Sequence, residues 1–291
     1  HPEITLEANP DDLTPDYIAM LRTLPFNRLS MGIQTFNESI LKVLQRRHTA
    51  RQAIEAFQNC RAAGFQNISI DLMYGLPGET LSTWQQDLDQ ALLLHPEHLS
   101  AYHLIYEEDT VLWKLREQHK VEEADEDLSV SLFSTLIDRL TSEGYDHYEI
   151  SNFSLPGLYS RHNSSYWTEK KYLGCGPSAH SYNGVSRQWN VASLDTYIKG
   201  ISAGTPVFEI EELDLYTRYN DFVITRIRTE WGMPLSKLRD EFGEKLYDYC
   251  LRMAAPHLKQ GTLELVNDIL KLTRKGIFIS DGIMSDMLWT D

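Results

Sequence analysis

The strongest constraint on the fold of this chain is the alternation of strand-like and helix-like segments over its first third. Four segments are typical of β-strands, and they lie at residues 4–8, 29–33, 68–73 and 99–106. Helical patterns separate them at a spacing of roughly 25–35 residues, which predicts βαβ units and a parallel sheet. In such sheets the functional side chains gather at the carboxyl ends of the strands. We therefore expect an α/β fold with its site at that edge.

N-cap residues predict where the helices of this region begin. Thr14 precedes Pro15, a residue favoured at the first helical position. Asn37, Thr49 and Thr80 stand in the same way before three further segments with helical apolar spacing. Helices are therefore expected to begin directly after these four cap residues.

The second half of the chain has a different pattern. A helix over 128–143 leads to a strand over 145–153 that runs into a loop. Residues 154–206 lack clear periodicity and are rich in Gly, Ser, Asn, Tyr and Trp, a composition common in segments that line a site. Further helices and a hairpin are expected over 216–227, 235–242, 246–258 and 263–273.

Helices that precede a small hairpin suggest a winged-helix-like module at the end of the chain. Its usual association with DNA is an analogy of fold only. The sequence thus predicts three parts, residues 1–155, 156–205 and 206–291, of which the middle one links the other two.

Charge and cysteine content exclude several classes of protein. The net charge of −15 disfavours a nucleic-acid partner, because duplex-binding proteins carry a basic face. No apolar run is long enough for a membrane span, and no signal peptide is visible. Cys60, Cys175 and Cys250 are too far apart for a disulfide framework or a local metal motif. A reducing cytoplasm is the expected compartment. Cys175, between two glycines, is expected to be a small buried residue, with a reactive thiol as the alternative.

Four polar side chains near the predicted strand ends are candidates for ligand binding. Glu7 and Asp71 lie within strands, Gln34 directly follows one, and Arg46 lies between two helices. A charged group in a buried strand is unfavourable unless it is paired or ligated. Carboxylates on strands that point the same way suit a ligand with hydroxyl and amino groups, and Arg pairs with a carboxylate in a fork. A structural salt bridge or hydrogen bond is the alternative for each carboxylate alone.

A second cluster is dense in His, Asn, Tyr and Trp, at residues 160–167 and 172–181. Such side chains suit a flat aromatic ligand, and His162 or His180 has the chemistry to ligate iron. The alternative is structural: the aromatic residues pack a loop, and the histidines bond to the backbone.

Several ordered motifs resemble one known family. Residues 3–10 (EITLEANP), 27–36 (NRLSMGIQTF) and 71–78 (DLMYGLPG) resemble the oxygen-independent coproporphyrinogen III oxidases, which belong to the radical S-adenosylmethionine (SAM) proteins. Residues 161–167 (RHNSSYW) resemble the HNxxYW motif of the heme-chaperone (HemW) branch. The resemblance extends over nearly the whole chain and includes the C-terminal module.

The resemblance implies a partial (β/α)6 radical-SAM barrel whose first strands are missing, followed by a small winged-helix-like domain. It implies that Glu7 meets the methionine amino end of SAM, that Asp71 meets the ribose, and that Gln34 and Arg46 complete the pocket. It makes four residues of the second cluster candidates for a heme or porphyrin site, His162, Asn163, Tyr166 and Trp167.

One departure from the family pattern concerns the metal cluster. The family carries a CxxxCxxC motif that holds a [4Fe–4S] cluster, and this chain has no such spacing. The chain also begins with His1 rather than Met. The simplest expectation is a piece of a longer protein whose cluster lies in the missing part, and a homologue that lost its cluster is the alternative. In either case this chain should not cleave SAM, and its incomplete sheet should expose an edge for self-association.

Two functions follow from the resemblance. The first is oxidative decarboxylation of the propionate side chains of a porphyrin precursor to vinyl groups. The second is heme binding and delivery without oxidase activity, which HNxxYW favours. An acidic winged-helix interaction protein is a third class, but it leaves Glu7 and Asp71 without a role.

Overall fold

The computed structural model describes residues 2–290, so His1 lies outside the described part. The chain forms two compact units, of which the first ends at Ser160 and the second begins at Arg161. Each unit is described by itself below. The predicted division into 1–155, 156–205 and 206–291 stays a prediction.

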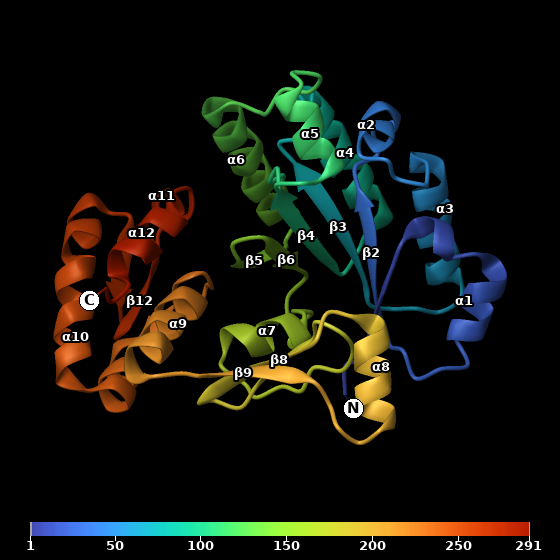
Figure 1. Ribbon diagram of the computed structural model, residues 1–291. Helices are drawn as coiled ribbons and strands as arrows, with labels where there is room; N and C mark the ends of the chain where they lie inside the picture. Colours follow the sequence, from blue (N-terminus) through green and yellow to red (C-terminus); the bar gives the residue numbers. More distant parts are fainter. Residues whose placement is uncertain (1, 291) are drawn as a thin grey trace. The chain divides into compact units, whose positions relative to one another are not determined.

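A six-stranded sheet organises the first unit (Figure 1). Its order is β1-β2-β3-β4-β6-β5, with parallel pairing from β1 to β4. The strands are β1 (Thr5–Ala8), β2 (Arg28–Gln34), β3 (Ile68–Tyr74), β4 (His98–His103), β5 (Asp146–Glu149) and β6 (Asn152–Ser154). The expected α/β architecture with parallel βαβ units is thus confirmed, and β1 forms one edge of the sheet within the described residues.

The helices of this unit begin where the cap residues predict. The side chains of Thr14, Asn37, Thr49 and Thr80 each accept a hydrogen bond from the first turn of the following helix. The helical elements are η1 (Pro10–Asp12), α1 (Pro15–Leu21), α2 (Glu38–Val43), α3 (Ala50–Ala62), α4 (Leu81–Leu94), α5 (Val111–Glu117) and α6 (Glu126–Ser142). Buried Trp84 ties α4 to α6, because its indole N–H donates to the carbonyl of Leu132 at 3.0 Å.

The two faces of the sheet differ in chemistry. Side chains alternate along each strand, so the register identifies which residues share a face. One face is apolar and contributes to the core, through residues such as Leu29, Met31, Ile70, Leu99 and Phe153. The other face is polar and carries Thr5, Glu7, Arg28, Ser30, Ser69, Asp71, His98, Ser100, Asn152 and Ser154. The polar face is therefore the candidate for ligand binding.

The end of this unit differs from the expectation of one strand over 145–153. The chain forms two strands there, β5 and β6, which pair antiparallel. β6 lies between β4 and β5 and runs antiparallel to both. The side chain of Glu149 stabilises the reversal by accepting bonds from the backbone N–H of Ser151, at 3.0 Å, and from the amide of Asn152. The sequence lacks the Gly or Asn-Gly pair that marks most tight hairpins.

The second unit begins with α7 (Arg161–Trp167) and a three-stranded antiparallel sheet. The sheet has the order β7-β8-β9, formed by β7 (His180–Tyr182), β8 (Ser186–Asn190) and β9 (Phe208–Glu212). Helix α8 (Leu194–Ser202) connects β8 and β9 in the chain. The segment that seemed aperiodic in the sequence thus contains short regular elements.

The end of the chain has the order of helices and hairpin expected of a winged-helix-like module. Its elements are α9 (Leu215–Ile227), β10 (Met233–Pro234), α10 (Leu235–Gln260), β11 (Leu263–Val266), β12 (Ile269–Leu272), α11 (Arg274–Ile277) and α12 (Ser280–Met287). α10 is broken at Gly243, where φ is 79° and ψ is 171°. The break lies between the two helices expected over 235–242 and 246–258.

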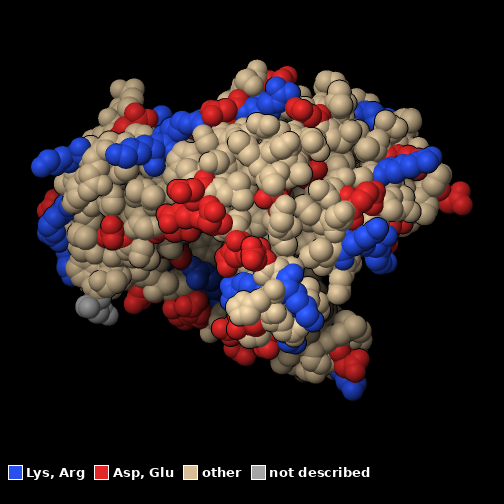
Figure 2. All heavy atoms as spheres, turned by 90° about the horizontal axis from the view of Figure 1, so that it is seen from above, with Lys and Arg blue, Asp and Glu red and all other residues tan. Residues whose placement is uncertain are grey.

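The charged residues are dispersed over the surface. Figure 2 shows acidic and basic side chains interspersed over one face, and its coloured atoms form no extended basic patch. Among residues 2–290, no helix combines the length and the apolar character that crossing a membrane requires.

Candidate functional site

Asp71 lies on the polar face of the six-stranded sheet, between two hydroxyl donors. The Ser30 hydroxyl is 3.4 Å from each carboxylate oxygen, and the neighbouring Ser100 hydroxyl, which donates to Asn152 Oδ1 at 3.1 Å, also lowers the pKa of Asp71. Protein surrounds most of the carboxyl group, although part of the residue stays accessible. Burial raises the pKa of Asp71 from 3.8 to about 6, and the charge of Glu7 acts in the same direction. Near neutral pH this carboxylate is mostly ionised and can accept hydrogen bonds on the polar face of the sheet.

Glu7 shares the polar face with Asp71, but its surroundings differ from the expectation. It lies on the edge strand β1 opposite Ser30, and its side chain is exposed. The strands of Glu7 and Asp71 are not neighbours, because β2 lies between them. The argument that Glu7 is a buried charge is therefore wrong, since an edge strand leaves its side chains open to solvent. Its negative charge nevertheless acts to raise the pKa of Asp71.

Gln34 and Arg46 converge over Gly32 at the end of β2. The register between β2 and β3 shifts between Gly32 and Gln34, and Gln34 has a φ of 72°. This bulge re-aims the side chain, so that Gln34 Nε2 lies 3.0 Å from the position that a Cβ on Gly32 would take. Arg46 Nη2 donates to the Gly32 carbonyl at 2.9 Å and to Asn9 Oδ1 at 2.7 Å. A side chain at residue 32 would press on the end of the Gln34 side chain, and Asn9, which accepts from Arg46, joins the candidate residues that the sequence argument missed.

Two buried carboxylates hold the loops that follow β2 and β3. Asp87 on α4 accepts bonds from the Thr35 hydroxyl at 2.5 Å and from the Phe36 N–H at 2.9 Å, directly after Gln34. Glu79 accepts bonds from the N–H groups of Gly75, at 2.7 Å, and Leu76. Burial raises the pKa of Glu79 to about 7 and also raises that of Asp87. Asp87 could have been found in the sequence, because it is a carboxylate on the apolar, buried side of an amphipathic helix.

A buried cation accompanies the carboxylates on the polar face. Arg28 is 3 % exposed, and its Nε has no hydrogen-bond partner among the described residues. Its charge lowers the pKa of Asp71 and so opposes the effect of Glu7. Nearby His98 bonds to Ser69 at 2.8 Å and to the Tyr148 hydroxyl at 2.6 Å, and burial holds its pKa well below the usual 6.5. His98 is therefore neutral, and Arg28 supplies the positive charge.

The His, Asn, Tyr and Trp residues of the second cluster lie on α7 in the second unit. The Tyr166 hydroxyl is 2.9 Å from His162 Nε2, one helical turn away, and the two rings meet edge to face. Tyr166 also packs against Tyr172, with ring centroids 4.8 Å apart. His162 is exposed, and Asn163 is its half-buried neighbour. The helix thus presents an imidazole supported by a group of tyrosines.

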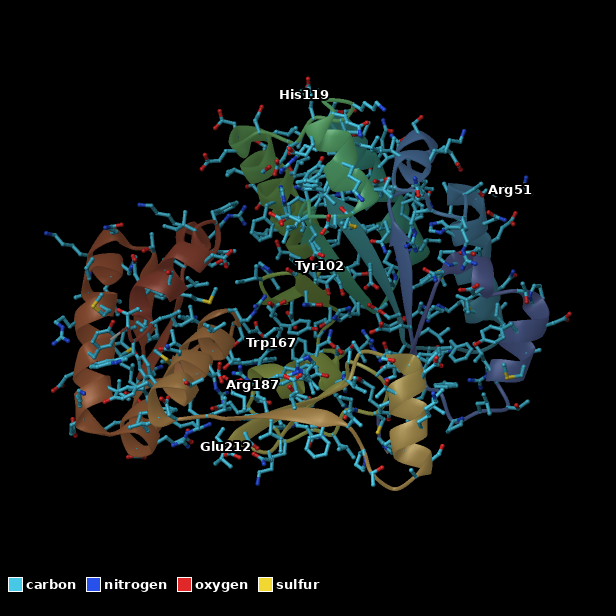
Figure 3. The ribbon with its side chains drawn as sticks, viewed as in Figure 1. Arg51, Tyr102, His119, Trp167, Arg187 and Glu212 are labelled. Carbon is cyan, nitrogen blue, oxygen red and sulfur yellow. The ribbon has the colours of Figure 1, made fainter. Side chains whose placement is uncertain are left out.

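Trp167 closes the motif at the end of α7 (Figure 3). The Arg228 guanidinium lies 4.3 Å from the centroid of its ring. The indole N–H of Trp167 and the hydroxyl of Ser164 are buried and have no hydrogen-bond partner among the described residues. Unpaired buried donors are rare in folded proteins, and a ligand that accepts hydrogen bonds would satisfy them.

A small cavity of about 170 Å³ lies beside this motif within the second unit. Its lining includes Tyr166, Tyr172 and Tyr182, together with Arg187 and Asp221, which form an ion pair. Cavities that enclose small molecules usually measure roughly 300–1,000 Å³. This one is therefore too small to enclose a tetrapyrrole, and such a ligand would lie mainly on the surface of the unit.

His180 and Cys175 lie outside this group. His180 stacks on Trp189, with centroids 5.9 Å apart, on the β7-β8 sheet. Cys175 is exposed, so the expectation of a small buried residue is wrong, because the loop between Gly174 and Gly176 lies on the surface. Cys60 and Cys250 are buried in helices, and burial raises the pKa of both thiols to about 11.

Comparisons with known proteins agree with this geometry. A model of the radical SAM superfamily matches residues 1–91, and a model of the HemN C-terminal domain matches residues 213–279. A protein named heme chaperone HemW from Bacillus subtilis is 30 % identical over 287 residues, which cover 98 % of this chain and 76 % of that protein. The protein of the same name from Lactococcus lactis is 32 % identical over 292 residues. The match covers 99 % of this chain and 76 % of that protein.

A solved structure shows the same fold. Coproporphyrinogen III oxidase (HemN) from Escherichia coli, a radical SAM enzyme, superposes with a TM-score of 0.81 at 22 % identity. The match covers 98 % of this chain and 69 % of that one. The fold and the polar sheet face thus define a radical SAM protein of the HemN type. The chain belongs to the HemW family within that class.

The radical SAM superfamily is defined by SAM and a [4Fe–4S] cluster. The residues of this chain fit SAM but not the cluster. Gly32 with its surrounding polar groups and the hydroxyl-flanked Asp71 form a cradle suited to a polar nucleoside ligand. The cluster does not fit, because its thiolate ligands must lie close together and the three cysteines lie on separate elements. Within residues 2–290, no group of three or more His, Cys, Asp or Glu is arranged to hold a metal ion.

Proposed function

We propose that this chain is a heme chaperone of the cytoplasm that binds heme at α7 and SAM on the polar sheet face. The observation that carries the proposal is the exposed His162 imidazole, which Tyr166 supports from the same face of α7. Imidazole is a common axial ligand of heme iron. Two relatives named heme chaperone HemW support the same function.

The openness of the motif favours transfer over permanent binding. A cavity of about 170 Å³ leaves most of a tetrapyrrole uncovered. Burial of apolar ligand surface is a major source of affinity, so a partly covered heme is released more readily than an enclosed one. A protein that delivers heme needs this property, whereas an enzyme that keeps heme as a prosthetic group does not.

On the first unit, we propose that four side chains hold SAM. Asp71 would accept hydrogen bonds from the ribose hydroxyls, and Glu7 would meet the ammonium group. Gln34 and Arg46 would complete the pocket, with the Arg46 guanidinium near the carboxylate of the methionine part. SAM supplies one-electron chemistry beside a reduced cluster, and residues 2–290 contain no ligand set for one.

Oxidative decarboxylation of coproporphyrinogen is the second candidate function. It is favoured by the polar SAM-type face and by the shared fold with coproporphyrinogen III oxidase. Heme binding at α7 is favoured over it by the His162–Tyr166 pair and by the relatives named heme chaperone HemW. The chaperone function is therefore the one that the present residues support best.

Titration of the chain with heme tests the proposal. We expect one heme per chain, a Soret band typical of histidine ligation, and transfer of the heme to apomyoglobin. His162→Ala should weaken heme binding by about ten-fold, which corresponds to the loss of roughly 1.4 kcal/mol. His180→Ala is the matched control and should leave the titration unchanged. Equal heme binding by wild type and His162→Ala would contradict the assignment of the ligand, and absence of saturable heme binding would contradict the function.

A further inference from the structure

Strand β9 forms an open edge of the small sheet in the second unit. All five of its residues, Phe208–Glu212, are exposed, and it pairs only with β8 within the described residues. The pairing is regular from end to end, without a register shift. Edge strands of natural proteins are usually protected by charged side chains, especially Lys, by Pro, by bulges or by a covering element, and charge repels only strands of the same sign. β9 contains no Lys or Pro, which makes it a candidate for pairing with another strand.

The backbone groups of three β9 residues point away from β8. The N–H of Leu213 donates to Val185, at 2.9 Å, and the carbonyl of Val207 accepts from Val191, at 3.1 Å. In an antiparallel pair, alternate residues bond to the neighbour, so 207, 209, 211 and 213 face β8. The N–H and C=O groups of Phe208, Ile210 and Glu212 therefore face outward, and none of them bonds within the described residues.

The side chains of β9 combine acidic and apolar groups. Phe208 is 40 % exposed and Ile210 is 53 % exposed. Glu209, Glu211 and Glu212 give the strand three negative charges. The nearest cation, Arg187 on β8, is 3.8 Å from Glu211 but is engaged more closely by Asp221 (Figure 3 labels Arg187 and Glu212). The edge therefore keeps an uncompensated negative charge beside exposed apolar surface.

This charge pattern disfavours a second copy of β9 as the partner. If two copies paired antiparallel about Ile210, Glu209 of each would lie opposite Glu211 of the other. Like charges placed directly opposite each other destabilise a strand pair. A strand with Lys or Arg at these positions would instead form two favourable cross-strand pairs, and its apolar residues would cover Phe208 and Ile210.

We propose that β9 is a docking edge for an extended segment of another protein in which basic and apolar residues alternate. The segment adds as a further antiparallel strand and takes up the outward backbone groups of Phe208, Ile210 and Glu212. Main-chain hydrogen bonds supply affinity in this mode of recognition, and side-chain pairs supply specificity. The inference is independent of heme binding, although β9 pairs with β8, the strand that carries Arg187 at the cavity beside Tyr166.

The test uses a short acetylated and amidated peptide of alternating lysine and valine, labelled for fluorescence polarisation. A peptide of alternating glutamate and valine is its matched control. We expect the lysine peptide to bind the whole chain in a salt-dependent manner and to protect the amides of Ile210 and Glu212 from hydrogen exchange. The glutamate peptide should bind at least about ten-fold more weakly.

Two variants separate the backbone and charge contributions. Ile210→Pro removes an outward N–H that β8 does not use, so the fold should remain while peptide affinity falls by about ten-fold. Glu209→Lys with Glu211→Lys should reverse the preference between the two peptides, whereas Glu108→Lys on the first unit should not. Equal binding of both peptides, unchanged affinity in Ile210→Pro, or unprotected Ile210 and Glu212 amides would overturn the proposal. Heme titration of each variant reports independently on the fold of the second unit.

Discussion

The two units hold their polar groups in opposite ways. In the first unit the candidate ligands project from a sheet, and the loops beside them are fixed by the buried carboxylates of Asp87 and Glu79. In the second unit the His162–Tyr166 pair lies on a helix of seven residues, and its imidazole is exposed. The first unit therefore holds its candidate residues on a rigid sheet, and the second exposes its imidazole on a short helix.

This difference in rigidity and exposure indicates what each candidate site is suited to do. A preorganised pocket on rigid elements lowers the entropy that a ligand loses on binding and so favours tight, specific recognition. An exposed group on a short helix covers less of its ligand and favours exchange. A protein that keeps a small cofactor in one unit and passes a larger ligand from the other would need this division. The predictions below test it, beginning with the largest expected effect.

Replacement of Asp87 tests whether the first unit depends on its buried carboxylates. Asp87→Ala leaves the Phe36 N–H and the fully buried Thr35 without their acceptor. We expect the free energy of unfolding to fall by about 2–4 kcal/mol, since unsatisfied buried donors are costly. Urea unfolding of Asp89→Ala is the control, because Asp89 on the same helix makes only a surface pair with Arg139, worth about 0–1 kcal/mol. An equal loss of unfolding free energy in the two variants would show that the bonds of Asp87 to the loop do not stabilise the unit more than a surface ion pair does.

The titration of Asp71 tests the SAM site on the same unit. Its pKa is raised to about 6, so the carboxylate is protonated below that pH and ionised above it. Since the ionised form is the better acceptor, SAM affinity should rise as the pH increases through about 6. Asp71→Asn should weaken binding by about ten-fold to a hundred-fold and remove this pH dependence. Calorimetric titration with SAM measures both. A variant with wild-type affinity and pH profile would contradict the role proposed for Asp71, and its heme titration should be unchanged.

The smallest effect is expected for the hydroxyl that supports His162. Tyr166→Phe keeps the ring that packs against Tyr172 but removes the hydrogen bond to His162 Nε2. We expect heme affinity to fall by about two-fold to five-fold, in line with roughly 0.5–1 kcal/mol for one partly exposed bond. The heme absorbance titration checks this, with Tyr197→Phe on α8 as the matched control. A loss as large as that of His162→Ala would mean that Tyr166 itself contacts the ligand.

Much of the fold followed from local signals in the sequence. Thr14, Asn37, Thr49 and Thr80 cap helices where their patterns predict, because a cap depends on a few adjacent residues. The parallel sheet followed from the spacing of strands and helices. The helix–hairpin order of the C-terminal module was also visible, since each of its elements has a clear period.

Features that depend on distant contacts could not be predicted. The bulge that turns Gln34 over Gly32 arises from the pairing of β2 with β3, and no residue type at this position predicts a bulge. The edge position of β1, which exposes Glu7, depends on the order of strands in the sheet. Likewise, β6 inserts between β4 and β5 through pairing with both. The sequence therefore indicated a set of candidate residues, but not their arrangement.

The most direct test of the account is a pair of equilibrium titrations, with SAM and with heme, on the same preparations of wild type, Asp71→Asn and His162→Ala. We predict that Asp71→Asn loses SAM affinity and keeps heme affinity, and that His162→Ala does the reverse. Parallel losses of both ligands in either well-folded variant would contradict the claim that the two units carry separate sites.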